Sequence, residues 1–498
     1  MIWAIDALSS GRPDSAAPLL RFPPQAVDQT PGSPYAIHKW ELETLLVHFF
    51  LESCEGPLSN GTSHFDCNNF SHVATLINRL RKLEDVESGL YLREGNLSIF
   101  GEMHRIAQRQ FHWQQGYFNV PQFYRYSFIY AQGECGEYFE RTYGFPITEL
   151  NFVGFVFYAH AVKYPWFSSA ASLPDVGLTD DLMRRALPLL VISVEQARAQ
   201  TREIVETMNA RHGRAIPTAY LPSIFRRYPL VNCSGGSEQL IAPIPELLLI
   251  RVTSGLYYDL VRGGEKVLND ANDRFEEYCA KYIAAMMRRF DVSREYSYEL
   301  RKGISVQTPD VLVRDGNQLV LAIECKATKL TYLAQFAEDP FEAERKQYLQ
   351  IAKAVFQLWR FFSHVRRGLV HEDIAVDAPG VVLTLDSFLV LSRELQNKVI
   401  KEASALADQE GNILAEDRRH IIFCSIDDLE IVLSRSTEDI FLGTLRAAQS
   451  EQYRGWRLRE INREVRAELG EIEPKKFPFE LGTVLPWWAR VKELKLVE

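Results

Sequence analysis

The chain has 498 residues, which is too long for one ordinary hydrophobic core, so roughly two or three domains are expected. Hydrophobic residues make up 46% of the chain and charged residues 24%, a composition that excludes intrinsic disorder as its general state. The formal net charge of −9 argues against a protein that coats nucleic acid, so any polyanion has to meet a local basic patch. The candidates for such a patch are Arg288-Arg289, Arg301-Lys302, Lys329, Arg345-Lys346 and Arg366-Arg367.

The cysteines and the apolar runs indicate in which cellular compartment the protein is expected. Seven cysteines are scattered along the chain and never form a CxxC pair, which indicates a reducing environment and no zinc site. The N-terminus lacks a basic region and its apolar run breaks at Asp6, so no signal peptide is expected. No apolar run reaches the length of a membrane span. We therefore expect a cytoplasmic protein without a membrane partner.

The N-terminal half is predicted to be helical after a short arm. Residues 1–35 are rich in proline, serine and glycine and are predicted to form an extended arm. Residues 36–225 show helical periodicity and are predicted to form a large, mainly α-helical domain whose role the sequence does not indicate. The expected helices cover residues 37–51, 70–83, 99–114, 121–141 and 150–162, with two more between 179 and 211.

From residue 226 the pattern changes to alternating strands and helices. Short apolar runs surround a flexible glycine-rich loop at 234–237, and a helix is expected over 269–290. A hairpin, a helix over 341–362 and strands at 380–385 and 420–424 follow. This alternation predicts an α/β domain over residues 226–435, with a mixed sheet flanked by helices. Residues 436–498 are expected to form a helical C-terminal appendage.

The hairpin carries the main functional signal. Residues 311–314 and 319–323 are apolar, β-branched runs, and between them Asp315-Gly316-Asn317 suits a tight turn. Because side chains alternate along a strand, Glu324 and Lys326 share one side of it. Asp310 opens the first strand directly after Pro309, so the fold-back can bring it close to Glu324.

Two carboxylates and a lysine at one strand end suggest metal-dependent phosphate chemistry. Mg²⁺, or Mn²⁺ in its place, prefers oxygen ligands, and Asp310, Glu324 and the backbone carbonyl of Cys325 would supply three. Lys326 would hold or deprotonate the attacking water and stabilise the charge that develops on the phosphorus.

These residues resemble the PD-(D/E)xK nuclease superfamily, which has a restriction-endonuclease-like fold, with Pro309-Asp310 and Glu324-Cys325-Lys326 as the two halves of the motif. The resemblance implies a further glutamate on the preceding helix. Glu276 shares its stripe with apolar residues, whereas Glu277 stands four residues before Lys281, so Glu276 is expected to face the site. The resemblance also makes Gln350 and Lys353, on the helix after the motif, candidates for binding the substrate strand.

The expected function is metal-dependent hydrolysis of nucleic acid, most directly by a DNA endonuclease of restriction or phage-defence type, as in bacterial defence effectors. An RNA-cleaving abortive-infection nuclease and a catalytically degenerate binding subunit of a larger complex are the alternatives. No GxxxxGK[ST] loop occurs, so any nucleotide-driven step would require a separate NTPase as partner. The sequence leaves open the specificity, the activating trigger and the oligomeric state, a homo-oligomer included.

Overall fold

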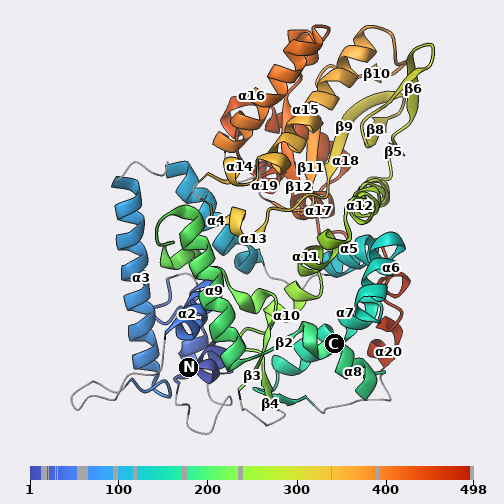
Figure 1. The fold of residues 1–498 in the computed structure, drawn as a ribbon. Helices are drawn as coiled ribbons and strands as arrows, with labels where there is room; N and C mark the ends of the chain where they lie inside the picture. Colours follow the sequence, from blue (N-terminus) through green and yellow to red (C-terminus); the bar gives the residue numbers. More distant parts are fainter. Residues whose placement is uncertain are drawn as a thin grey trace. The chain divides into compact units, whose positions relative to one another are not determined.

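A computed structural model gives the fold of the chain (Figure 1). It describes all residues except 13–19, 21, 29, 31, 53–64, 94–98, 116–119, 170–176, 234–238, 338, 388–392 and 494–498. The chain divides into two compact units. The first consists of Met1–Ser98, Arg109–Gly263 and Leu481–Glu498, and the second consists of Ile99–Gln108 and Gly264–Glu480.

The first unit is mainly helical, as the sequence predicted. Its helices are α1 (Ile2–Ser9), α2 (Lys39–Leu51), α3 (Phe70–Arg93), α5 (Val120–Tyr130), α6 (Gly133–Tyr143), α7 (Ile147–Ala161), α8 (Asp180–Ala186), α9 (Val194–His212), α10 (Glu246–Arg251), α11 (Tyr257–Leu260) and α20 (Trp488–Glu493). Helix α4 (Ile99–Gln115) runs across the division between the units. A small sheet of order β1-β4-β3-β2 is formed by β1 (Phe167–Ser168), β2 (Val191–Ser193), β3 (Leu230–Asn232) and β4 (Gln239–Ile241).

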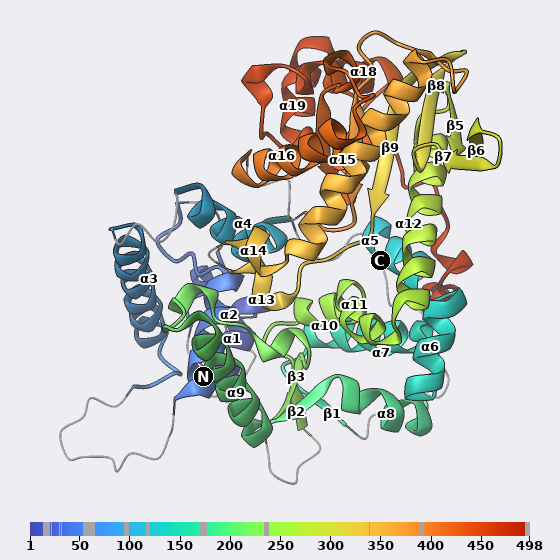
Figure 2. The same cartoon turned by 45° about the horizontal axis from the view of Figure 1, so that its top comes forward.

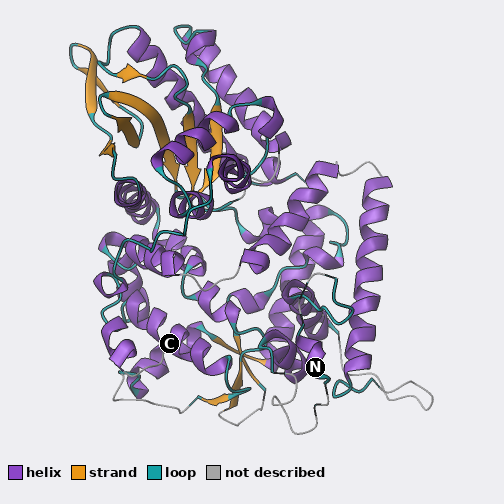
Figure 3. Cartoon of the chain, turned by 180° about the vertical axis from the view of Figure 1, so that it is seen from behind, coloured by secondary structure: helices purple, strands orange, loops and turns teal. Residues whose placement is uncertain are grey.

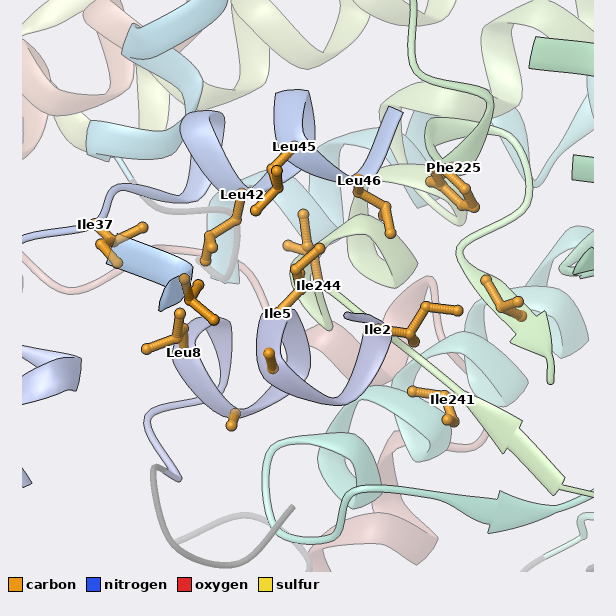
Figure 4. Close-up of a cluster of buried hydrophobic side chains, with 14 of the residues drawn as sticks. Ile2, Ile5, Leu8, Ile37, Leu42, Leu45, Leu46, Phe225, Ile241 and Ile244 are labelled. Carbon is orange, nitrogen blue, oxygen red and sulfur yellow. The ribbon is translucent and has the colours of Figure 1, made fainter. Parts of the chain in front are cut away.

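The start of the chain belongs to the core of this unit, so the prediction of an extended arm over residues 1–35 was wrong at its N-terminal end. Helix α1 places Ile2, Ile5 and Leu8 on one face by their three-residue spacing, and all three are buried (Figure 4). They pack in one cluster with residues of α2, such as Leu42. The proline- and glycine-rich composition of the segment comes from residues after α1, several of which lie outside the described part.

Two further predictions need correction in this unit. The single helix predicted over 121–141 is two helices, α5 and α6, because the chain turns at Ala131 and Gln132 before Gly133, whose φ is 52°. The predicted domain boundary at residue 226 lies instead at 263–264. Strands β3 and β4 pair with β2 and β1, so they complete the sheet of the first unit rather than opening the α/β domain.

The second unit is an α/β domain built on a mixed sheet (Figure 3). The strand order is β12-β11-β9-β8-β5, and β10 (Asp373–Ile374) also pairs with β9. Strand β8 (Val311–Asp315) runs antiparallel to β5 (Phe290–Arg294) and to β9 (Gln318–Lys326), whereas β9, β11 (Gly380–Thr384) and β12 (Ile421–Ser425) run parallel to one another. A separate ribbon of β6 (Ser297–Arg301) and β7 (Ile304–Gln307) connects β5 to β8.

Helices cover both faces of this sheet. Helix α15 (Arg345–Arg366) packs against β9, β11 and α16 (Arg393–Glu410), and α12 (Glu265–Met286) packs against β5, β8, β9 and α17 (Ile426–Ser434) (Figure 2). The unit also contains α13 (Tyr332–Gln335), α14 (Pro340–Ala343), α18 (Glu438–Ala448) and α19 (Leu458–Leu469). On the α15 side, Leu312, Ala322 and Val382 join the apolar core. This packing holds the β8–β9 hairpin in the middle of the sheet.

The predicted C-terminal appendage over residues 436–498 is divided between the units. Helices α18 and α19 belong to the second unit, and the residues from Leu481 onward belong to the first. There the indole N–H of Trp487 donates to the Thr148 carbonyl at 2.8 Å, and its ring packs against Phe152 and Phe155. Burying the tryptophan removes apolar surface from water, which explains the return of the chain. None of the helices in the described ranges is both long and apolar enough to cross a bilayer.

Candidate active site

The β8–β9 hairpin brings Asp310 to the carboxyl end of β9. Its turn uses Gly316 at a φ of 63°, a conformation that side chains other than glycine's rarely adopt. Because Val311 pairs with Ile323, Asp310 lies beside the last residues of β9. The backbone N–H of Cys325 donates to Asp310 Oδ2 at 2.6 Å, so the strand itself orients this carboxylate. The expected convergence of Asp310 and Glu324 therefore has a structural cause.

The ammonium of Lys326 lies among three oxygen groups at this strand end. Its Nζ is 3.1 Å from Glu324 Oε2, 2.9 Å from the carbonyl oxygen of Cys325 and 3.7 Å from Asp310 Oδ2. Both carboxylates are buried, with Glu324 2% exposed and Asp310 8% exposed. Buried carboxylates are tolerated only when a positive charge and hydrogen bonds compensate for lost water, and Lys326 supplies both.

A third carboxylate reaches the cluster from α12. Burial, and next the charge of Asp310, raise the pKa of Glu276 to about 7, while Lys326 and Arg294 act in the opposite direction. Arg294 Nη2 lies 3.0 Å from Glu276 Oε2. Glu277 faces away and pairs with Lys281 at 2.7 Å, as predicted. The stripe of α12 that faces the sheet therefore carries Glu276.

The cluster holds more acidic groups than one ammonium can neutralise. Burial raises the pKa of Glu324 to about 8, although Lys326 opposes the shift. Burial acts to lower the pKa of Lys326, but the charges of Glu324 and Asp310 outweigh it and raise that pKa above its ordinary value. Near neutral pH the lysine is therefore charged, and the raised pKa values of Glu276 and Glu324 bring the titration of both carboxyl groups close to neutral pH.

Three neighbours of the cluster were not predicted. Arg294 holds Glu276, Glu295 donates its backbone N–H to the Asp310 carbonyl at 3.1 Å, and Asn272 Oδ1 accepts from the N–H of Ala327 at 3.1 Å. Asn272 lies four residues before Glu276 on α12, so helical spacing could have found it. Nothing in the local sequence indicates Arg294 or Glu295, because their positions depend on how β5 pairs with β8.

Within the described ranges, the predicted substrate-binding residues on α15 make no hydrogen bond or ion pair with the cluster. Gln350 is half-buried and Lys353 is exposed, and neither makes a hydrogen bond or ion pair within the described ranges. Their role therefore stays a prediction.

Much of the predicted basic patch is already paired with carboxylates. The pairs are Arg289 with Asp315 and Asp439, Lys329 with Asp386, Arg345 with Glu342, and Arg366 with Asp417. No ion pair of Arg301 or Lys302 occurs in the part of the chain that the structure describes, and both are exposed near the tip of the β6–β7 ribbon. Within the described ranges, exposed positive charge without an ion pair is thus found at Arg301 and Lys302 on this ribbon and also at Arg288, Lys346 and Arg367.

The donor set fits a hard divalent cation in part. Three oxygen groups surround one positive charge, the ammonium of Lys326, and such oxygens are the ligands that Mg²⁺ prefers. Among the described residues, however, no group of three or more His, Cys, Asp and Glu side chains is arranged to hold a metal ion. A cation here would rely on Asp310, Glu324 and the Cys325 carbonyl, with water completing its coordination.

Comparisons with protein-family models, with curated protein sequences and with solved structures find no match for this chain.

Proposed function

We propose that the second unit is a metal-dependent nuclease that hydrolyses phosphodiester bonds in nucleic acid, with DNA as the expected substrate. One observation carries the proposal: the charged amine of Lys326 lies within 3.7 Å of both Asp310 and Glu324 at the end of a buried strand. An arrangement of two carboxylates and a lysine suits the stabilisation of negative charge on a phosphate. The resemblance to the PD-(D/E)xK superfamily supports the same reading.

Different residues of the cluster would bind the metal ion, bind the phosphate and accept the proton of the attacking water. Asp310, Glu324 and the Cys325 carbonyl would hold a Mg²⁺ or Mn²⁺ ion, which when bound supplies positive charge that polarises the phosphate. Lys326 remains protonated because its pKa is raised, so its Nζ donates hydrogen bonds to a phosphate oxygen rather than removing a proton. Glu276, with a pKa of about 7, is better suited to accept the proton of the attacking water at a carboxylate oxygen.

A catalytically inactive binding subunit is the second candidate. It is favoured by the finding that, among the described residues, no group of three or more His, Cys, Asp and Glu side chains is arranged to hold a metal ion. In that case the ion pairs of Lys326 would only stabilise the buried strand end. A role in bacterial defence, a partner NTPase and cleavage of RNA instead of DNA are further proposals that the cluster alone does not distinguish.

Cleavage assays on plasmid, linear duplex, single-stranded DNA and RNA test the proposal. The variants are Asp310→Asn and Glu324→Gln, because an amide oxygen at position 310 can still accept the Cys325 N–H and both changes keep the side-chain volume. Asp291→Asn is the matched control, since Asp291 is an exposed aspartate of the same sheet with 74% of its side chain accessible.

We expect wild type and Asp291→Asn to cleave one substrate class with Mg²⁺ or Mn²⁺ but not with Ca²⁺. Asp310→Asn and Glu324→Gln should lose cleavage by at least ~100-fold while their circular dichroism spectra remain unchanged. Full activity of either variant would overturn the site. Inactivity of the wild type on every substrate, together with metal-independent binding of nucleic acid, would favour the binding subunit.

A further inference from the structure

A cavity of about 210 Å³ lies in the second unit, away from the cluster of Asp310, Glu324 and Lys326. It follows the free edge of the sheet along β12, the end strand, and is closed by residues of α15, α16 and the segment that leads into α19. Strands β9, β11 and β12 are parallel, and Ile421 is level with Ala322 of β9 through Gly380 of β11. The lining residues Ile421 to Phe423 of β12 are level with Ala322 to Glu324 of β9, so the cavity is separated from the cluster across the sheet, by the width of β11 and β12.

Polar groups without partners line this cavity. The His420 imidazole and the Asn397 amide make no hydrogen bond within the described ranges, and Arg418 Nε is buried there without an acceptor. Burial, and next the charge of Arg454, lower the pKa of His420, so the ring is neutral at pH 7 and offers one donor and one acceptor. Leaving the buried Arg418 Nε without an acceptor is costly, whereas Asn397 is exposed and His420 is half-buried, so both can be reached by a ligand from solvent.

Aromatic rings face the same space. Trp456 lines the cavity and is 47% exposed, and its ring makes a T-shaped contact with Tyr453 with ring centroids 5.4 Å apart. A tryptophan with nearly half of its surface exposed beside a polar cavity is suited to stacking on a planar heterocycle.

Guanidinium groups supply positive charge to this cavity. Arg454 pairs with Glu451 at 2.8 Å, but the two side chains are 42% and 72% exposed. Such an exposed pair contributes little, so Arg454 can turn to an anionic ligand at small cost. Arg419 is less available to a ligand, because its Nη1 already donates to the carbonyls of Ala375 and Ala378 at 2.8 and 3.1 Å.

We infer that this cavity binds a nucleotide, with the base stacked on Trp456, the ring edge hydrogen-bonded by His420 and Asn397, and the phosphate held by Arg454. The volume is below the range of about 300–1,000 Å³ that is usual for drug-sized ligands, so the cavity can enclose only part of a nucleotide, and the rest of the ligand would extend into solvent. The nucleotide is either free in solution or part of a single strand. This site does not depend on the proposed nuclease.

Calorimetric titration of the full chain in EDTA tests the inference, because EDTA removes any divalent metal from the other cluster. The probes are AMP, GMP, CMP, UMP, inorganic phosphate and a single-stranded DNA of eight nucleotides. We expect saturable binding of at least one nucleotide probe, weakened roughly 10-fold or more by Trp456→Ala because the stacking surface is lost. Asn397→Ala should weaken it as well. The matched control is Trp166→Ala, which removes a comparably exposed tryptophan, 42% accessible, from the first unit.

Binding of a mononucleotide that depends on Trp456 would identify a free nucleotide as the ligand. Binding of the oligonucleotide alone, with the same dependence, would assign the cavity to one nucleotide of a strand. Three results would overturn the inference: no saturable binding of any nucleotide probe, inorganic phosphate binding as tightly as the nucleotides, or equal effects of Trp456→Ala and Trp166→Ala. Circular dichroism of each variant excludes unfolding as the cause of a loss.

Discussion

Replacing Glu276 by glutamine should change activity and stability in opposite directions. The pKa of Glu276 is about 7 in the folded chain against an ordinary value of 4.5, mainly because the carboxyl group is buried. Between these values the folded state holds a proton that the unfolded state has lost. The stability of the wild type therefore falls as the pH rises from about 4.5 to about 7 and then levels off.

The size of this loss of stability follows from the pKa shift of Glu276. A difference of about 2.5 pH units corresponds to about 3 kcal/mol at pH 8, since each unit is worth about 1.4 kcal/mol. The side chain of Glu276 is only 16% exposed, so solvent screens little of this energy. Glutamine is uncharged at every pH and can still accept a hydrogen bond from Arg294. We expect Glu276→Gln to be more stable than wild type by about 3 kcal/mol at pH 8 and by almost nothing at pH 4.5.

Urea unfolding at pH 4.5, 6, 7 and 8, followed by circular dichroism, measures the difference between variant and wild type at each pH. Glu277→Gln is the matched control, because its exposed pair with Lys281 contributes only tenths of a kcal/mol. In the cleavage assay Glu276→Gln should lose at least ~100-fold and Glu277→Gln less than about threefold. The reasoning fails if Glu276→Gln is no more stable than wild type at pH 8, or if the two variants exchange their effects on cleavage.

Three further substitutions probe the lysine and the packing of the first unit. Lys326→Ala should lower turnover by several orders of magnitude while substrate binding in Ca²⁺ persists; lost binding with normal turnover per bound complex would instead make Lys326 a phosphate anchor. Gly154→Ala in α7 should destabilise the chain by about 1–3 kcal/mol in thermal unfolding, because the new Cβ would lie 2.8 Å from Val252 Cγ2. Gly89→Ala in α3 meets no atom within 4 Å and should stabilise by up to about 1 kcal/mol, so equal effects of the two changes would contradict this account.

The sequence by itself determined the β8–β9 hairpin and which face of α12 packs against the sheet. Both depend on local patterns: the turn at Gly316 and the alternation along β9 set the hairpin, and the apolar stripe of α12 separates Glu276 from Glu277. Such patterns act within a few residues, so they can be read without knowing which other segment packs against them. The convergence of Asp310 with Glu324 and Lys326 follows from the same hairpin.

Only the tertiary structure decided which distant segments meet. Helix α1 was taken for part of an arm because its short apolar face has no partner in its own sequence, whereas in the fold it packs with α2. From the sequence, strands β3 and β4 were expected to begin the α/β domain, whereas in the structure they pair with β2 and β1. Arg294 became the counterion of Glu276 through the pairing of β5 with β8. In each case hydrophobic periodicity shows that a face must be buried but not which partner buries it, because long-range pairing depends on packing across the whole chain.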